Sequence, residues 1–208
     1  MQINDFIIVN YSGKIKENNL EIDKGDNLPL IVGVNYTLKG IDKALLVMQV
    51  GDKKTIEVLP EDGFGNRDER LIRLVPLSEF KKHDTDPIPG MVVEADNMRG
   101  RVLSVSGGRV KVDFNHPLSG KTLIYDLEIK QKLEDIESKV KALVKMYTNM
   151  DEKINIATFE KDIEIELPPL INSLYKKKIA DDVMKFLGFE KVKFVEIFEK
   201  HKAEPKSQ

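Results

Sequence analysis

The sequence contains no cysteine and no tryptophan, and three of its 208 residues are histidines. Without cysteine the chain can form no disulfide framework, no thiol nucleophile and no Cys-ligated zinc site. His83, His116 and His201 are scattered through the chain without the spacing of metal ligands. We therefore expect no metal site.

Long apolar runs and a surplus of one charge are also missing. No run approaches the roughly 18 apolar residues of a membrane-spanning helix, and the first twenty residues lack the basic and apolar regions of a secretory signal. These absences predict a cytoplasmic protein with no membrane partner. The 33 basic and 35 acidic residues give a net charge of −2. With no basic-aromatic platform, a specific nucleic-acid partner is not expected either.

What the chain does contain is sufficient for a folded protein. Its apolar fraction of 41% is enough to bury a core, and its length allows one large domain or two to three small ones. All six arginines lie between Arg67 and Arg109, while the other basic residues are lysines. This local change in composition predicts a segment with constraints of its own.

The first 60 residues predict an α+β arrangement. Strands are expected over 5–15, 20–22, 30–32 and 53–60, with a loop over 24–29 and a short helix over 38–48. The helix is indicated by Leu38, Ile41, Leu45 and Met48, which recur at helical spacing. Strands on both sides of one short helix indicate an antiparallel sheet packed around it.

From residue 68 to residue 117 the pattern changes to short strand-like pieces. Turn signals such as Pro89-Gly90 and Gly107-Gly108 separate them, which is typical of a small all-β module. Residues 121–130 return to one long alternating strand that can close the first sheet. The all-β module is therefore predicted as an insertion into the first domain, which comprises residues 1–67 and 118–130.

Residues 131–208 predict a separate α/β domain. Amphipathic helices are expected over 132–147 and 171–187, the second ended by Gly188, with strands over 154–167 and 191–200 and a frayed tail over 201–208. The composition of this domain suits dimerisation, docking onto the first domain or client binding. The sequence does not choose among them.

Several ordered motifs resemble a known family. NYSGKI, EID, PLIVG, TLKGIDKALLVMQVGDKKTIEVLPEDGFG and TLIYDLEI are similar to the corresponding segments of FKBP-type peptidyl-prolyl cis/trans isomerases. The likeness extends to the SlyD-like subgroup, which carries an insert-in-flap chaperone domain where this chain changes composition. The C-terminal domain resembles that of the long archaeal members. The resemblance implies an FKBP-like antiparallel sheet wrapped on a short helix, with an inserted all-β domain and a C-terminal α/β domain.

The resemblance also assigns roles to individual residues. It implies a catalytic pocket formed by Tyr11, Asp23, Leu38, Phe64 and Tyr125, and substrate contacts from Ile22, Leu30, Thr37 and Ile41. Three of these residues depart from the family pattern: Ile22 and Ile41 replace aromatic residues, and Phe64 lacks the hydroxyl of a tyrosine. The departures bear on macrolide binding more than on isomerase activity. From the residues alone, Leu30, Leu38 and Ile41 are better explained as part of a core, and Asp23 as a turn residue.

The implied reaction needs no metal and no cofactor. Resonance opposes rotation about an amide bond with a barrier of about 18–20 kcal/mol, and a catalyst must bind the twisted amide better than either planar form. An apolar pocket favours the less polar twisted amide by removing water. Tyr11 and Asp23 supply the few polar groups, and we hypothesise that Asp23 orients the pocket and interacts with the twisting carbonyl.

Exposed apolar residues of the insertion suggest a groove for unfolded chains. Ile72, Leu74, Val75, Met91, Val92, Met98 and Phe114 are the candidates, and an extended segment could add a strand beside them. The alternative is that they fill the core of the small module. The sequence thus predicts an isomerase and chaperone for unfolded or proline-containing polypeptides. A non-catalytic holdase, or a chaperone that acts on the ribosome, is the alternative, and a homodimer through the C-terminal domain is a further candidate.

Overall fold

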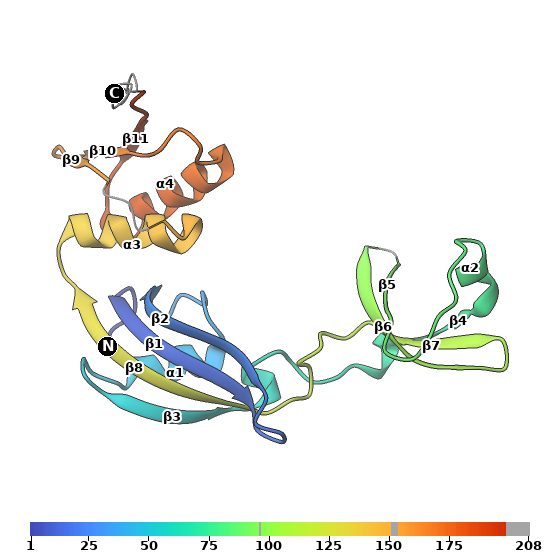
Figure 1. Cartoon of the computed structure of the whole chain (residues 1–208). Helices are drawn as coiled ribbons and strands as arrows, with labels where there is room; N and C mark the ends of the chain where they lie inside the picture. Colours follow the sequence, from blue (N-terminus) through green and yellow to red (C-terminus); the bar gives the residue numbers. More distant parts are fainter. Residues whose placement is uncertain (96, 151–153, 199–208) are drawn as a thin grey trace, which may run out of the picture.

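The computed structural model describes residues 1–95, 97–150 and 154–198, and within them the chain forms three sheets, each packed on its own buried cluster (Figure 1). The fold class is α+β, as predicted: an antiparallel sheet on a short helix, a small all-β insertion and a C-terminal α/β unit. The predicted tail over 201–208, including His201, lies outside the described residues.

The first sheet has the strand order β2-β1-β8-β3, with antiparallel pairing throughout. Its elements are β1 (Phe6–Ile15), β2 (Glu21–Ile31), β3 (Lys53–Val58) and β8 (Leu123–Leu133), with helix α1 (Lys39–Leu46) packed on one face. Helix α1 buries Ile41, Ala44 and Leu45 against this face. The last strand in the sequence, β8, therefore lies inside the sheet, between β1 and β3.

Residues 24–29, which we expected to form a loop, belong to β2. Strand β2 pairs with β1 along its length, with an irregularity between Val9 and Tyr11. Asn27 has a φ of 53°, and its backbone N–H donates to the Asn10 side chain at 2.8 Å. Asn27 thus accommodates a bulge in β2, because asparagine tolerates left-handed backbone.

The insertion is a four-stranded antiparallel sheet with the order β4-β7-β6-β5. Its elements are β4 (Ile72–Pro76), α2 (Leu77–Lys81), β5 (Val92–Ala95), β6 (Met98–Ser106) and β7 (Arg109–Asp113). All four strands were predicted, and helix α2 was not. Val102, Val110, Val112 and Phe114 form the core. Gly100 allows it to close, because a Cβ there would lie 2.7 Å from Val112 and Phe114.

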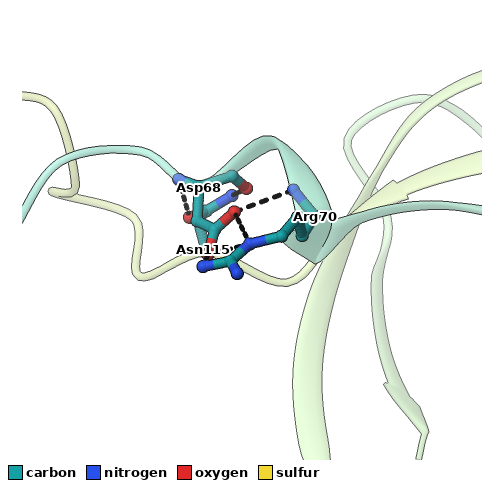
Figure 2. A network of polar contacts seen from close by, with 3 residues as sticks. All are labelled: Asp68, Arg70 and Asn115. Carbon is teal, nitrogen blue, oxygen red and sulfur yellow. Dashed lines mark hydrogen bonds and ion pairs between the residues drawn. The ribbon is translucent and has the colours of Figure 1, made fainter.

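Two connecting segments carry the insertion away from the first sheet, and hydrogen bonds join them at the base (Figures 1 and 2). The Asp68 backbone N–H donates to the Asn115 side chain at 2.8 Å, and the Asn115 amide donates to the Asp68 carbonyl at 2.9 Å. The Asp68 carboxylate also accepts hydrogen bonds from Arg70 at 2.8 and 2.9 Å, which lower its pKa. Closer to the first sheet, the Gly120 N–H donates to the Gly65 carbonyl at 2.8 Å. The insertion therefore leaves and returns to the first sheet at adjacent points.

The C-terminal unit packs two helices on a three-stranded sheet with the order β11-β10-β9. Its elements are α3 (Ile136–Thr148), β9 (Ile156–Thr158), β10 (Asp162–Glu166), α4 (Ser173–Leu187) and β11 (Lys191–Val195). The single strand predicted over 154–167 is a β9–β10 hairpin. Helix α4 ends at Gly188, which has a φ of 79°, as expected for this position. No described helix is long and apolar enough to cross a membrane.

One face of the first sheet packs into the core of the C-terminal unit. Phe6, Ile31 and Leu133 of the first sheet pack into the C-terminal cluster, while Ile7 and Val32 face α1. Successive strand residues point to opposite faces, so the two faces of β1 are covered by different units. The boundary predicted after residue 130 falls within β8, and the division into three domains stays a prediction.

Candidate active site

A cavity of about 310 Å³ opens between α1 and the first sheet. It is lined by Val9, Tyr11, Asp23, Leu30, Tyr36, Thr37, Leu38, Ile41, Leu45, Phe64, Tyr125 and Leu127. Eight of the nine residues predicted for the isomerase pocket are among them. The ninth, Ile22, packs against the same apolar cluster without lining the cavity.

The floor of the cavity is aliphatic and buried. Ile41 and Leu45 come from adjacent turns of α1, and Val9 and Leu127 come from the two central strands. Leu38 precedes α1, and its carbonyl accepts hydrogen bonds from the Ile41 and Asp42 N–H groups at 2.9 and 3.0 Å. The start of the helix thus fixes the backbone at the cavity wall. A guest in this cavity meets apolar side chains on most sides.

Tyr11 and Asp23 form a polar pair at the rim. The Tyr11 hydroxyl donates to the Asp23 carboxylate at 3.0 Å, between the adjacent strands β1 and β2. Burial raises the pKa of Tyr11 to about 12, and the hydrogen bond to Asp23 and its negative charge act in the same direction. Burial likewise raises the pKa of Tyr125, whose ring lies 6.3 Å from that of Tyr11. Both phenols are therefore neutral hydrogen-bond donors near pH 7.

Gly13 of the NYSGKI motif leaves room for the Tyr125 ring. A Cβ at position 13 would lie 2.4 Å from the Tyr125 ring, which pairs across from it on β8. The ring rests directly on the glycine backbone. Any larger residue at position 13 would displace the Tyr125 ring.

Phe64, at the edge of the cavity, is held by the segment that returns from the insertion. Its ring stacks on His116 with a centroid distance of 4.4 Å and an interplanar angle of 3°. The Ser119 hydroxyl donates to the Phe64 carbonyl at 3.1 Å. The sequence offered no reason to place His116 near the cavity, because the stacking depends on how the two connecting segments meet. The base of the insertion therefore holds in place Phe64, a residue that lines the cavity.

Four of the lining residues, Val9, Tyr36, Leu45 and Leu127, were not predicted for the site, and Tyr36 is the one with a polar side chain. It lies in the loop between β2 and α1, directly before the predicted Thr37 and Leu38. Its hydroxyl donates to Asp182 of helix α4, at 2.8 Å from each carboxylate oxygen. An aromatic residue beside Thr37 was a weak signal for the site. No local pattern could pair it with a carboxylate 146 residues away.

The insertion contains a hollow of about 630 Å³ between α2 and strand β5. Of the seven predicted groove residues, Val75, Met91, Val92 and Phe114 line it, together with Phe80. The other three, Ile72, Leu74 and Met98, do not: Met98 packs against the core, and Leu74 is 60% exposed elsewhere. Side chains alternate along β4, so Val75 faces the hollow whereas Leu74 points away from it.

The raised pKa of Tyr11 predicts a loss of stability at alkaline pH. An unfolded tyrosine ionises near pH 10, whereas the folded protein holds this proton to about pH 12. The contribution of Tyr11 should be complete below about pH 10 and decline as the pH rises toward 12. Denaturant unfolding of the wild type and of Tyr11→Phe across this range tests it, because phenylalanine has no proton to lose. Parallel pH profiles would contradict the prediction.

Comparisons with known proteins give relatives for both the pocket and the added units. Residues 73–118 match the family described as "FKBP26, IF domain", and residues 136–199 match the FKBP26 C-terminal family. The chain is 35% identical over 117 residues to a short-type peptidyl-prolyl cis-trans isomerase of Methanocaldococcus jannaschii, covering 55% of this chain and 74% of the relative. It is 38% identical over 103 residues to a probable FKBP-type 16 kDa peptidyl-prolyl cis-trans isomerase of Pseudomonas fluorescens, covering 47% and 67%. It is 29% identical over 105 residues to the isomerase SlyD of Helicobacter pylori, covering 49% and 57%.

Proposed function

The chain belongs to the FKBP-type peptidyl-prolyl cis-trans isomerases, and we propose that the cavity between α1 and the first sheet is the site where X-Pro bonds rotate. The observation that carries the proposal is the combination of an apolar floor with one polar pair, Tyr11 and Asp23, at its rim. The protein is a peptidyl-prolyl isomerase.

The pocket would act by binding the twisted amide more tightly than the planar one. The planar amide is the more polar form, and water stabilises it. An aliphatic floor of Val9, Ile41, Leu45 and Leu127 removes that water and so favours rotation. No bond is made or broken to carbon, and no proton must move.

Asp23 would supply the electrostatic part of the reaction. The hydroxyl of Tyr11 donates to one carboxylate oxygen and fixes its direction, leaving the other oxygen at the rim. From there the charge of the Asp23 carboxylate can interact electrostatically with the carbonyl group of the substrate as the amide rotates out of conjugation. Tyr11 would hold this geometry up to alkaline pH, because its pKa is raised.

The insertion would bind unfolded chains and deliver them to the pocket. Met91, Val92, Phe80 and Phe114 give its hollow an apolar lining, and β5 is an edge strand that can pair with an extended segment. Methionine adapts to different side chains. Capture on the insertion would raise the effective concentration of prolyl bonds at the pocket. Binding to the ribosome and to a second copy of the chain stays a prediction.

Substitutions at the rim and in the wall of the pocket test this proposal. Asp23→Ala is expected to lower kcat/KM on a short prolyl peptide about tenfold, about 1.4 kcal/mol of transition-state stabilisation. Leu38→Lys places an ammonium group in the apolar cavity and should abolish catalysis. Exchange spectroscopy on the peptide and proline-limited refolding of a protein client measure both.

Asp26→Asn is the matched control, because Asp26 lies on the same strand as Asp23 but outside the cavity. Equal rates for Asp23→Ala and wild type would remove the role of Asp23. An active Leu38→Lys variant would place catalysis elsewhere. A chain that suppresses aggregation but accelerates neither reaction would be a non-catalytic holdase.

A further inference from the structure

Tyr36 connects the pocket to the C-terminal unit. It is contributed by the loop between β2 and α1, lines the cavity and is 40% exposed. Its hydroxyl donates to Asp182 of α4 at 2.8 Å, and its ring meets Phe186 edge-on at 6.4 Å. Tyr147 of α3 donates to the same carboxylate at 2.5 Å. Both helices of the C-terminal unit thus take part in holding one wall residue of the pocket.

The backbone of the same loop is fixed from the opposite side. Asp42 of α1 is buried, and its carboxylate accepts hydrogen bonds from the Gly33 and Asn35 N–H groups at 3.2 and 2.9 Å. The loop is therefore tied to α1 through its main chain and to α4 through the Tyr36 side chain. A partly exposed aromatic side chain held at both ends has little freedom to leave the cavity wall.

The charge of Asp182 is not explained by packing. Its side chain is 6% exposed, and burying a carboxylate is costly unless hydrogen bonds replace water. An apolar residue of similar size would avoid that cost. The Asp182 carboxylate instead accepts hydrogen bonds from two phenol hydroxyls, and one of them belongs to Tyr36 of the pocket. The hydrogen bond to this carboxylate fixes the orientation of the Tyr36 side chain.

We infer that Tyr36 is a substrate-binding residue at the mouth of the isomerase pocket, and that Asp182 of the C-terminal unit is the positioning residue that holds it there. This rests on the proposed pocket. Tyr36 directly precedes Thr37 and Leu38 and lines the same cavity, so its ring can contact the residue that neighbours a bound proline. An aromatic face at that point suits a large apolar side chain next to the proline. The C-terminal unit thereby takes part in substrate recognition.

The ionisation of the two tyrosines gives a spectroscopic readout of the network. Burial raises the pKa of Tyr36, and the hydrogen bond to Asp182 and its charge add to this effect, while the hydrogen bond from Tyr147 opposes it. Burial is the main cause of the raised pKa of Tyr147, and the hydrogen bond to Asp182 is the second. Removing the carboxylate should therefore let both phenols ionise at lower pH. Absorbance titration of tyrosinate in the full chain reports this change.

The test compares Tyr36→Ala, Tyr36→Phe and Asp182→Leu in the full-length protein on two prolyl peptides. On a peptide with leucine before the proline, KM should rise about fivefold in Tyr36→Ala and about threefold in Asp182→Leu and Tyr36→Phe, with kcat little changed, because ground-state and transition-state binding are lost together. On a peptide with glycine before the proline, the variants should differ from wild type less than twofold, roughly. A purely structural role would change both peptides alike.

Asp181→Asn is the matched control, because Asp181 is the next residue on α4 and pairs at 2.7 Å with Lys177 on the surface. It should leave both KM values and the tyrosine titration unchanged. If Asp182→Leu shifts the titration while the KM values stay at wild type, the inference is wrong. If Asp182→Leu does not fold, Tyr36→Phe decides, since it removes one hydroxyl. Failure of the pocket itself would appear separately, as full activity in Leu38→Lys.

Discussion

Excising the insertion is expected to lower catalysis on an unfolded protein client about a hundredfold, because capture at a tethered site adds about 10²–10⁴ in effective affinity. Catalysis on a short peptide should change less than about twofold, because such a peptide does not need capture. The excision should remove residues 69–114 and join Asp68 to Asn115 with a short glycine-serine link. These two residues already hydrogen-bond to each other at 2.8 and 2.9 Å, so the link closes without strain.

This design keeps the wall of the pocket intact. His116 stacks on Phe64 and Ser119 donates to its carbonyl, so a wider excision over 68–117 would disturb the pocket by removing His116. Proline-limited refolding and peptide exchange measure the two activities. Within the full chain, Met91→Lys, in the hollow, should reproduce the loss on protein clients, and Leu74→Lys, outside it, should not. Equal losses on peptide and protein would contradict a capture role for the insertion.

Removing the C-terminal unit is expected to destabilise the first sheet by about 5 kcal/mol, since burying a large apolar side chain contributes about 1.5–3 kcal/mol. In the full chain Phe6 is 1% exposed and Ile31 0%, and both face the C-terminal core together with Leu133. In a fragment of residues 1–134 these side chains would face water. The loss approaches the whole stability of many domains, which is about 5–15 kcal/mol.

Amide hydrogen exchange of β1 and β8 measures this stability in both proteins, because it reports local opening in a chain with several units. Phe6→Thr with Ile31→Thr is the matched variant: it should make the fragment more soluble but destabilise the full chain. Exchange protection in the fragment equal to that in the full chain would refute the prediction. Activity lost in such a fragment would not by itself show that the C-terminal unit takes part in catalysis.

The local pattern of the sequence predicted most elements but not their arrangement. Periodicity and turn residues located the strands of the insertion and both C-terminal helices, because these signals depend on neighbouring residues. The bulge in β2 was mistaken for a loop, since Gly25 and Asn27 favour both. The position of β8 inside the sheet could not be read from its pattern, because pairing with β1 and β3 is decided by residues far away in the sequence.

The pocket was predictable to the extent that motifs carry it. The resemblance placed eight of nine residues at the cavity, because the spacing of strand, helix and flap motifs fixes their geometry. Tyr36 and Asp182 escaped because they meet only when the C-terminal unit packs on the first sheet. In the insertion, apolar character alone did not separate Met91 and Val92, which line the hollow, from Leu74, which faces away from it.

The central position of β8 also sets the order in which the chain can fold. On the ribosome, the insertion is complete once Phe114 has emerged, whereas the first sheet waits for residues up to Leu133. Closing a flexible loop costs entropy that grows with its length. An insertion that has already folded, with its two ends hydrogen-bonded together, replaces most of the long loop between β3 and β8 with a rigid body. The insertion that would capture other unfolded chains thereby also lowers the entropic cost of pairing β3 with β8 in its own chain.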